Sequence, residues 1–325
     1  MSQPDKQTLT EIIPGVYVIP GVTNVGVITD TNNSITDIYL VDTGRTEEQG
    51  LSVLNAITDF FNNKNQKFQI KAIFNTHAHS DHCGADSVIQ KQYNCPIYLS
   101  AYERGILDNP YLQGSILWGG FTPHELQNSL YKPAEVKDTR LIDFTKKIDF
   151  HSPDSSGSSD FSVSFLELPG HYYGDTGILI TAKNGDNILF SGDAISNREE
   201  LGKYWIQFMV QPEKFMQTLD KICKIPNLKC CIPSHGKIIY DDLNETAELC
   251  KIAVISTRQS ILNSLKHKKL TTEQVIQEAA KQNNISMGLG QYYLVSATIK
   301  SHLACLHDQK IIKMKVIENQ VVWEY

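Results

Sequence analysis

The chain has 325 residues, of which 41% are hydrophobic and 20% charged, and its formal net charge is −6. These fractions are close to those of folded globular proteins and exclude an intrinsically disordered chain. No uninterrupted apolar run reaches the roughly 18 residues of a membrane-spanning helix, and the first residues do not resemble a secretory signal. We therefore expect a cytoplasmic protein without a membrane partner, whose cysteines are free thiols.

The first part of the chain alternates between strand and helix patterns. Runs of β-branched and aromatic residues predict strands over 16–19 and 37–41. Apolar residues at helical spacing predict a helix over 47–62, and residues 68–74 predict another strand. Strand, helix and strand in this order favour a layered α/β architecture.

The middle of the chain is less regular. Residues 105–150 contain three prolines and predict a surface loop or lid, and the polar segment 152–160 predicts the tip of a hairpin. Strand patterns then follow over 161–168, 176–181 and 187–190.

The last part of the chain is predicted to be mostly helical. Thr271 and Gln274 fit a capping box at the start of one helix, and apolar residues within 295–306 mark one face of a second. We therefore predict two domains, a larger one over 1–243 and a helical, winged-helix-like extension over 244–325.

Residues of the types that bind metals follow the predicted strands. The densest segment, His77-Ala78-His79-Ser80-Asp81-His82, comes directly after the strand at 68–74. Three further segments each place one such residue in a turn, namely Pro169-Gly170-His171, Ser191-Gly192-Asp193 and Pro233-Ser234-His235. Imidazole and carboxylate groups suit borderline divalent ions, so the pattern predicts a metal centre with room for water.

Together these segments resemble the motifs of the metallo-β-lactamase-fold hydrolase superfamily, over about residues 11–240. The resemblance implies an α/β fold, a four-layer αβ/βα sandwich with a small extension. It implies two divalent ions, zinc first and iron or manganese as alternatives, held by His77, His79 and His171, by Asp81, His82 and His235, and by a bridging Asp193. A hydroxide between the ions would attack the substrate, and Asp81 would be the catalytic residue that orients it and accepts its proton.

Asp193 narrows the choice of branch within this family. Antibiotic-hydrolysing members generally carry Cys or another residue at that position, whereas glyoxalase II, lactonase and nuclease branches keep the acid. We expect a glyoxalase II-like hydrolase that cleaves a small ester, thioester or lactone. The segment Gly170–Asp175 lacks the second histidine of many members, and no basic cluster for glutathione is evident, which argues against a glutathione thioester.

Three other functions stay open. Residues 250–325 carry ten basic and five acidic side chains, a net charge of 10 − 5 = +5, and such an extension resembles that of an endoribonuclease-like branch that holds single-stranded nucleic acid. A mononuclear iron sulfur dioxygenase shares the motif, and a low-turnover ligand sensor would use the same ligands. We rank nucleic acid below a small-molecule substrate as the partner, and a homodimer is compatible with the sequence.

Four side chains are predicted to contact the substrate, namely Tyr172, Tyr204, Lys203 and Trp118. Tyr172 is the strongest candidate because it adjoins His171.

Overall fold

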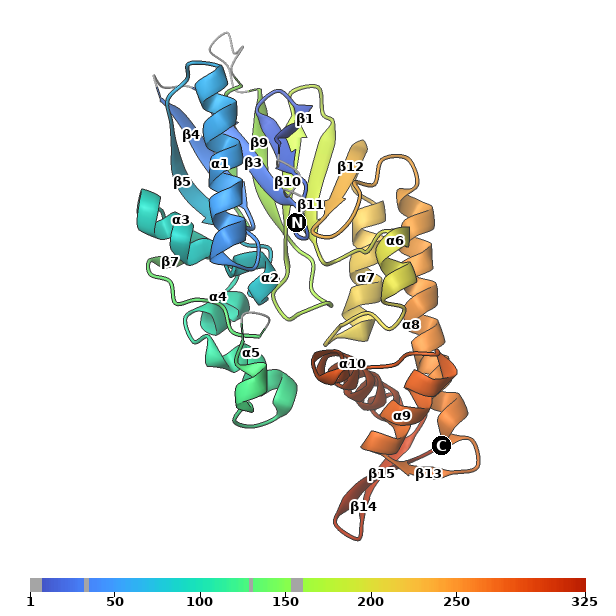
Figure 1. The fold of residues 1–325 in the computed structure, drawn as a ribbon. Coiled ribbons are helices and arrows are strands. Elements are labelled where there is room, and N and C mark those ends of the chain that lie inside the picture. Colours follow the sequence, from blue (N-terminus) through green and yellow to red (C-terminus); the bar gives the residue numbers. More distant parts are fainter. Residues whose placement is uncertain (1–7, 32–34, 129–130, 153–159) are drawn as a thin grey trace.

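The computed structural model describes residues 8–31, 35–128, 131–152 and 160–325 (Figure 1). Within these ranges the strands form three sheets. The first contains, in spatial order, β1 (Thr10–Ile13), β2 (Val16–Ile19), β3 (Val25–Asp30), β4 (Thr36–Val41), β5 (Phe68–Phe74), β6 (Ile97–Leu99) and β7 (Thr139–Leu141). The second contains β12 (Leu228–Pro233), β11 (Asn187–Gly192), β10 (Thr176–Ala182), β9 (Phe161–Glu167) and β8 (Lys147–Phe150).

The two large sheets pack face to face through the alternating side chains of their strands. In β12, for example, Cys230 and Ile232 point into the core between the sheets, whereas Cys231 points to the opposite face. This period-2 alternation is the geometry of a strand that is buried on both faces. It also separates the neighbouring thiols, and the seven cysteines form no disulfide.

Helices cover the outer face of each large sheet. The helices α1 (Glu47–Asn63) and α3 (Asp86–Tyr93) share a core with the first sheet, in which Ile57 packs with Leu40 and Ile73. The helices α7 (Pro212–Cys223) and α8 (Leu243–Leu265) cover the second sheet. Figure 1 shows the resulting order of layers, helix, sheet, sheet and helix. The predicted αβ/βα sandwich is thereby confirmed.

The remaining helices of the sandwich are short. They are α2 (Ser80–Cys83), α4 (Ala101–Leu107), α5 (Tyr111–Trp118), the 3-10 turn η1 (His124–Leu126) and α6 (Arg198–Lys203). The prediction of a surface loop over 105–150 is therefore wrong in part, because α5, η1, β7 and β8 lie within it. The strands β7 and β8 are short edge strands with charged, exposed positions such as Arg140 and Lys147, so their apolar pattern is weak. The predicted hairpin tip at 152–160 lies almost wholly outside the described residues.

The C-terminal region contains β13 (Lys269–Thr271), α9 (Thr272–Gln282), α10 (Leu289–Asp308), β14 (Lys313–Ile317) and β15 (Gln320–Glu324), and its sheet has the order β13-β15-β14. The capping box at Thr271 and Gln274 is confirmed. One helix joins this region to the sandwich, since Cys250 of α8 packs in the sandwich and Leu265 packs with α9 and α10. The division into two domains at residue 243 stays a prediction.

The helix α10 also contacts the sandwich directly. The hydroxyl of Thr298 accepts a hydrogen bond from the backbone N–H of Met209 (3.1 Å) and donates one to the carbonyl oxygen of Gln207 (3.2 Å). The rings of Trp118 in α5 and Tyr293 in α10 meet edge to face at 4.9 Å. In the described part of the chain, no helix combines the length and the apolar character that crossing a bilayer requires.

Candidate metal centre

Four loops at one edge of the sandwich bring the predicted ligands together. One loop follows β5 and continues into α2, the second joins β9 to β10, and the others follow β11 and β12. All seven side chains predicted as ligands belong to three overlapping groups, whose ligand atoms lie within 4.8 Å of one another in each group. The first loop leaves the first sheet and the other three leave the second, so the site forms only when the two sheets pack together.

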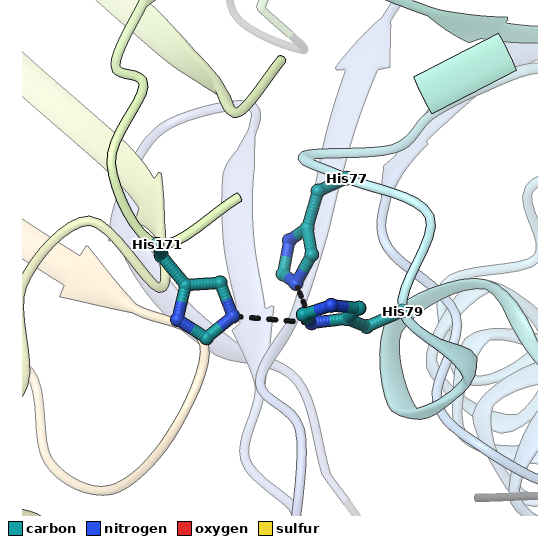
Figure 2. Close-up of side chains that lie close together, drawn as sticks. All are labelled: His77, His79 and His171. Carbon is teal, nitrogen blue, oxygen red and sulfur yellow. Dashed lines mark hydrogen bonds between the residues drawn. The ribbon is translucent and has the colours of Figure 1, made fainter. Parts of the chain in front are cut away.

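The first group consists of three histidines. Nε2 of His77 lies 2.9 Å from Nδ1 of His79, and Nε2 of His171 lies 3.1 Å from the same atom. Figure 2 shows the three rings with these nitrogens turned toward a common point. Zinc binds imidazole nitrogen at about 2.0–2.1 Å, so two nitrogens on a tetrahedral ion stand roughly 3.3 Å apart. The observed separations are close to that spacing.

The second group consists of Asp81, His82 and His235. Oδ2 of Asp81 lies 3.3 Å from Nε2 of His235 and 3.8 Å from Nε2 of His82. Asp193 stands between the two groups, because its Oδ2 is 3.4 Å from Nε2 of His171 and 3.5 Å from Nε2 of His82. A carboxylate at this position can reach a cation in either group.

One atom of the second group provides direct evidence that the site fits a cation. Nε2 of His82 is buried and has no hydrogen-bond partner among the described residues, although two carboxylates lie within 3.8 Å of it. Buried polar atoms in folded proteins are nearly always satisfied, so this nitrogen requires a partner. A divalent cation between the ring and the carboxylates would supply one, and the residues present therefore fit a metal.

The electrostatics around the histidines also suit a cation. Burial lowers the pKa of His79 to about 3, and burial together with the neighbouring histidines lowers the pKa of His77 well below its usual value, so both rings are neutral. Burial acts in the same direction on His82, but Asp193, Asp81 and Asp42 outweigh it and raise the pKa of His82 to about 10. These carboxylates create a negative potential that favours a cation at this point.

Asp42 is a site residue that the sequence reasoning missed. Its Oδ2 lies 2.9 Å from Nδ1 of His82, and it accepts hydrogen bonds from the backbone N–H and the hydroxyl of Thr76, both at 2.8 Å. A carboxylate behind a metal-ligating histidine fixes the tautomer and raises the basicity of the ring. The available signal was Asp42-Thr43-Gly44 at the end of a predicted strand, which indicates only a turn.

His235 is oriented by a backbone group instead. Its Nδ1 donates to the carbonyl oxygen of Val22 at 2.6 Å, which directs Nε2 toward Asp81. The loop that carries His235 is held by Asn24, whose side chain donates to the carbonyl oxygens of Pro233 (2.9 Å) and Gly236 (2.8 Å). Asn24 was also missed, since a single Asn in a turn carries no specific signal.

Two glycines allow the loops to approach their neighbours. Gly192 has φ +59°, and a Cβ there would lie 2.9 Å from Cβ of Thr76. Gly170 has φ +146°, and a Cβ would lie 2.4 Å from Cα of Phe215 in α7. Both positions combine a backbone conformation that favours glycine with a lack of space for a side chain.

The two groups differ in exposure. The side chains of Asp81 and His235 are 27% and 26% exposed, whereas that of His77 is fully buried. The ring of Phe208, which is partly buried, packs edge to face against His79 (5.2 Å) and His171 (5.1 Å). Solvent therefore reaches the cluster from the side of the second group.

The predicted substrate contacts lie at different distances from this cluster. Tyr172 is fully buried, with its ring 4.5 Å from that of His79. Trp118 contacts Tyr293, Lys203 pairs with Glu199 and Glu200 within α6, and Tyr204 is exposed at the end of α6. The contacts described for the last three include none of the clustered ligands, and all four substrate contacts stay predictions.

The chain belongs to the metallo-beta-lactamase superfamily, whose family model matches residues 18–235. It is 26% identical over 161 residues to a probable metallo-hydrolase of Bacillus subtilis, a match that covers 50% of this chain and 56% of the relative. It is also 26% identical over 172 residues to a probable metallo-hydrolase of Methanocaldococcus jannaschii, covering 52% and 71%. The matched segment thus spans little more than half of the first relative.

Solved structures extend the likeness to almost the whole chain. A metallo-beta-lactamase family protein from Thermus thermophilus superimposes with a TM-score of 0.71 at 15% identity, covering 97% of this chain and 100% of that one. A beta-lactamase domain protein from Burkholderia ambifaria gives 0.72 at 14% identity, covering 99% and 95%. At such identities the likeness concerns the fold alone, and with this coverage it includes the C-terminal extension.

Proposed function

We propose that this member of the metallo-beta-lactamase superfamily is a metal-dependent hydrolase with a dinuclear centre, and that it cleaves a small ester, thioester or lactone. The observation that carries the proposal is the position of Asp193, with one carboxylate oxygen 3.4 Å from a histidine of the first group and 3.5 Å from a histidine of the second. Both matched curated relatives are named as probable metallo-hydrolases, which agrees with this activity.

The ligands divide into two sets that share one carboxylate. His77, His79 and His171 would hold one ion, Asp81, His82 and His235 the other, and Asp193 both. Divalent ions bound there would lower the pKa of a water molecule and polarise the bond to be cleaved. Asp42 and the carbonyl of Val22 keep His82 and His235 in fixed orientations.

Asp81 is the residue we assign to proton transfer. It is a ligand candidate of the second group, yet its side chain is 27% exposed on the side that solvent reaches. Burial raises its pKa, but His82 and His235 outweigh that effect and lower it, so Asp81 is an acceptor near neutral pH. It can therefore accept a hydrogen bond from an incoming water and orient it, and we propose that it also receives the proton of that water as the substrate is attacked.

The preference for a small molecule over a nucleic acid rests on ion pairs that engage basic side chains. Lys203, the cation that the sequence suggested for substrate binding, pairs with Glu199 and Glu200. In the C-terminal sheet, Lys269 and Lys315 both pair with Glu324, which reduces the positive charge available to a phosphate backbone. These pairings favour a small-molecule substrate over a nucleic acid.

A probe panel with metal-loaded protein tests the proposal. We expect hydrolysis of a generic ester, thioester or lactone, about two zinc ions per chain, and no turnover by the Asp81→Ala variant. Cleavage of only a phosphodiester or single-stranded RNA would replace the substrate class with the nuclease alternative. One iron per chain with persulfide oxidation would indicate the dioxygenase, and tight metal binding without any turnover would indicate a sensor.

A further inference from the structure

Glu103 is a fully buried acid that belongs to none of the ligand motifs. It lies in α4, on the first-sheet side of the site, and its side chain has no exposure to solvent. Burying a carboxylate is costly unless hydrogen bonds compensate for the lost water, so its partners indicate what it does.

The two oxygens of Glu103 accept hydrogen bonds from two different ligand loops. Oε2 accepts from the backbone N–H of Ala78 at 2.9 Å, and Oε1 accepts from the backbone N–H of Gly174 at 2.8 Å. Ala78 stands between His77 and His79, and Gly174 lies in the loop of His171. One carboxylate therefore connects the two loops that supply the first group of ligands.

The loop of His171 is shaped to reach this carboxylate. A Cβ at Gly174 would lie 3.1 Å from Oε1 of Glu103 and 2.2 Å from Oγ of Ser100, so only glycine lets the backbone approach α4. The next residue, Asp175, accepts from the backbone N–H of Tyr172 at 2.6 Å, which closes the loop on itself. Asp175 also faces the first group, with Oδ1 3.9 Å from Nδ1 of His77.

We propose that Glu103 is a positioning residue that holds the loop of His77 and His79 at a fixed distance from the loop of His171, and thereby sets metal affinity at the first group. The inference rests on the proposed metal-dependent function, but it concerns binding and not turnover. Glutamate is suited to this role because both of its oxygens accept. Glutamine would offer one acceptor and one donor, and the donor would face a backbone N–H.

The test compares Glu103→Gln with a control variant, Thr257→Ala. Thr257 is buried in α8 and donates to the carbonyl oxygen of Ala253 at 2.9 Å, so its loss perturbs a buried hydrogen bond away from the site. Zinc affinity is measured by competition with a chromophoric chelator. Loss of a residue that supports metal ligands lowers affinity about 10- to 100-fold, and we expect this for Glu103→Gln and no change for Thr257→Ala.

Amide hydrogen exchange supplies a second readout that needs no activity. In the metal-free protein, Glu103→Gln should accelerate exchange at Ala78 and Gly174 together, while the amides of α1 and α8 stay protected. Unchanged zinc affinity, or acceleration in only one loop, would overturn the proposal. If the variant does not fold, exchange in the wild-type protein still tests the proposal. The positioning role of Glu103 requires these two amides to be protected and to open at the same rate.

Zinc binding without hydrolysis of any probe would contradict the proposed function, but it would not contradict the positioning role of Glu103.

Discussion

Nε2 of His171 lies 3.1 Å from Nδ1 of His79, although 92 positions separate the two residues in the chain. His79 belongs to the loop after β5 of the first sheet, and His171 belongs to the loop before β10 of the second. The candidate metal centre therefore spans the junction between the two sheets, and its geometry depends on how they pack.

Metal removal should destabilise the protein. A ligand that binds only the folded state adds about 2.7 kcal/mol to the free energy of unfolding at a hundredfold excess over its dissociation constant. We expect the melting temperature to fall when a chelator removes zinc and to recover on zinc addition. The His79→Ala variant is the control, and an equal chelator effect on both proteins would mean that the stabilising ion does not use the first group of ligands.

Replacing Asp42 should lower the zinc affinity of the second group of ligands more than that of the first. The Asp42→Asn variant keeps the shape of the side chain, and asparagine tolerates the positive φ of 57° at this position. It removes the negative charge 2.9 Å from His82, so we expect affinity for one of two zinc ions to fall about 10- to 100-fold.

A zinc titration that resolves two binding events checks the Asp42→Asn prediction. Asp37→Asn is a matched control, because Asp37 lies in β4, the strand that Asp42 follows, and pairs with Gln69 and Lys71 instead of a ligand. If both binding events weaken equally, Asp42 supports the whole centre and not His82 in particular.

Acid should destabilise the C-terminal extension through His302. Burial, assisted by Arg258, lowers the pKa of this histidine from 6.5 to about 3, and neither ring nitrogen has a partner among the described residues. The folded state therefore binds this proton less readily than the unfolded chain. The contribution of His302 is complete above pH 6.5 and is lost as pH falls toward 3, by about 1.4 kcal/mol per pH unit.

Urea denaturation at pH 7 and pH 5 measures the effect of His302. The loss of unfolding free energy between these pH values should be about 2 kcal/mol smaller in His302→Leu than in the wild-type protein. The same dependence in both proteins would show that His302 takes up its proton in the folded state.

Removing the hydroxyl of Tyr131 should not destabilise the protein. This side chain is 4% exposed, and its hydroxyl has no hydrogen-bond partner among the described residues. Burial and the charge of Asp81 raise its pKa to about 12. A buried hydroxyl without a partner costs about 1–3 kcal/mol, so Tyr131→Phe should raise the free energy of unfolding by about 1 kcal/mol. Destabilisation in chemical denaturation would reveal a partner for the hydroxyl.

The sequence reveals the predicted ligands, but it does not reveal the residues that hold those ligands in place. His77, His79, Asp81 and His82 form a dense local motif, and the other ligands follow strands whose alternation is visible in the chain. The supporting residues carry no such pattern, since the partner of Glu103 at Gly174 is 71 positions away. Such a contact arises only when the loop before β10 of the second sheet packs against α4, which lies on the first sheet.

Edge strands were missed for a related reason. The inner strands are buried on both faces and therefore show long apolar runs, whereas β7 and β8 expose most of their residues. Their positions depend on hydrogen bonds to the neighbouring strands β6 and β9, which no local pattern encodes.

The continuous helix α8 determines where the chain can be shortened. At 1.5 Å per residue its 23 residues extend about 35 Å, from the sandwich to the C-terminal sheet. A truncation at residue 243 would strip Cys250 and Val254 from the surface of the second sheet and uncover Leu219 and Cys231. A truncation after Lys266 would keep that cover and remove only the small sheet with α9 and α10. The shorter protein that retains α8 therefore keeps the second sheet covered and uncovers only the residues that pack with α9 and α10, such as Ile261 and Leu265, so it is the better form in which to measure the extension's contribution to substrate choice.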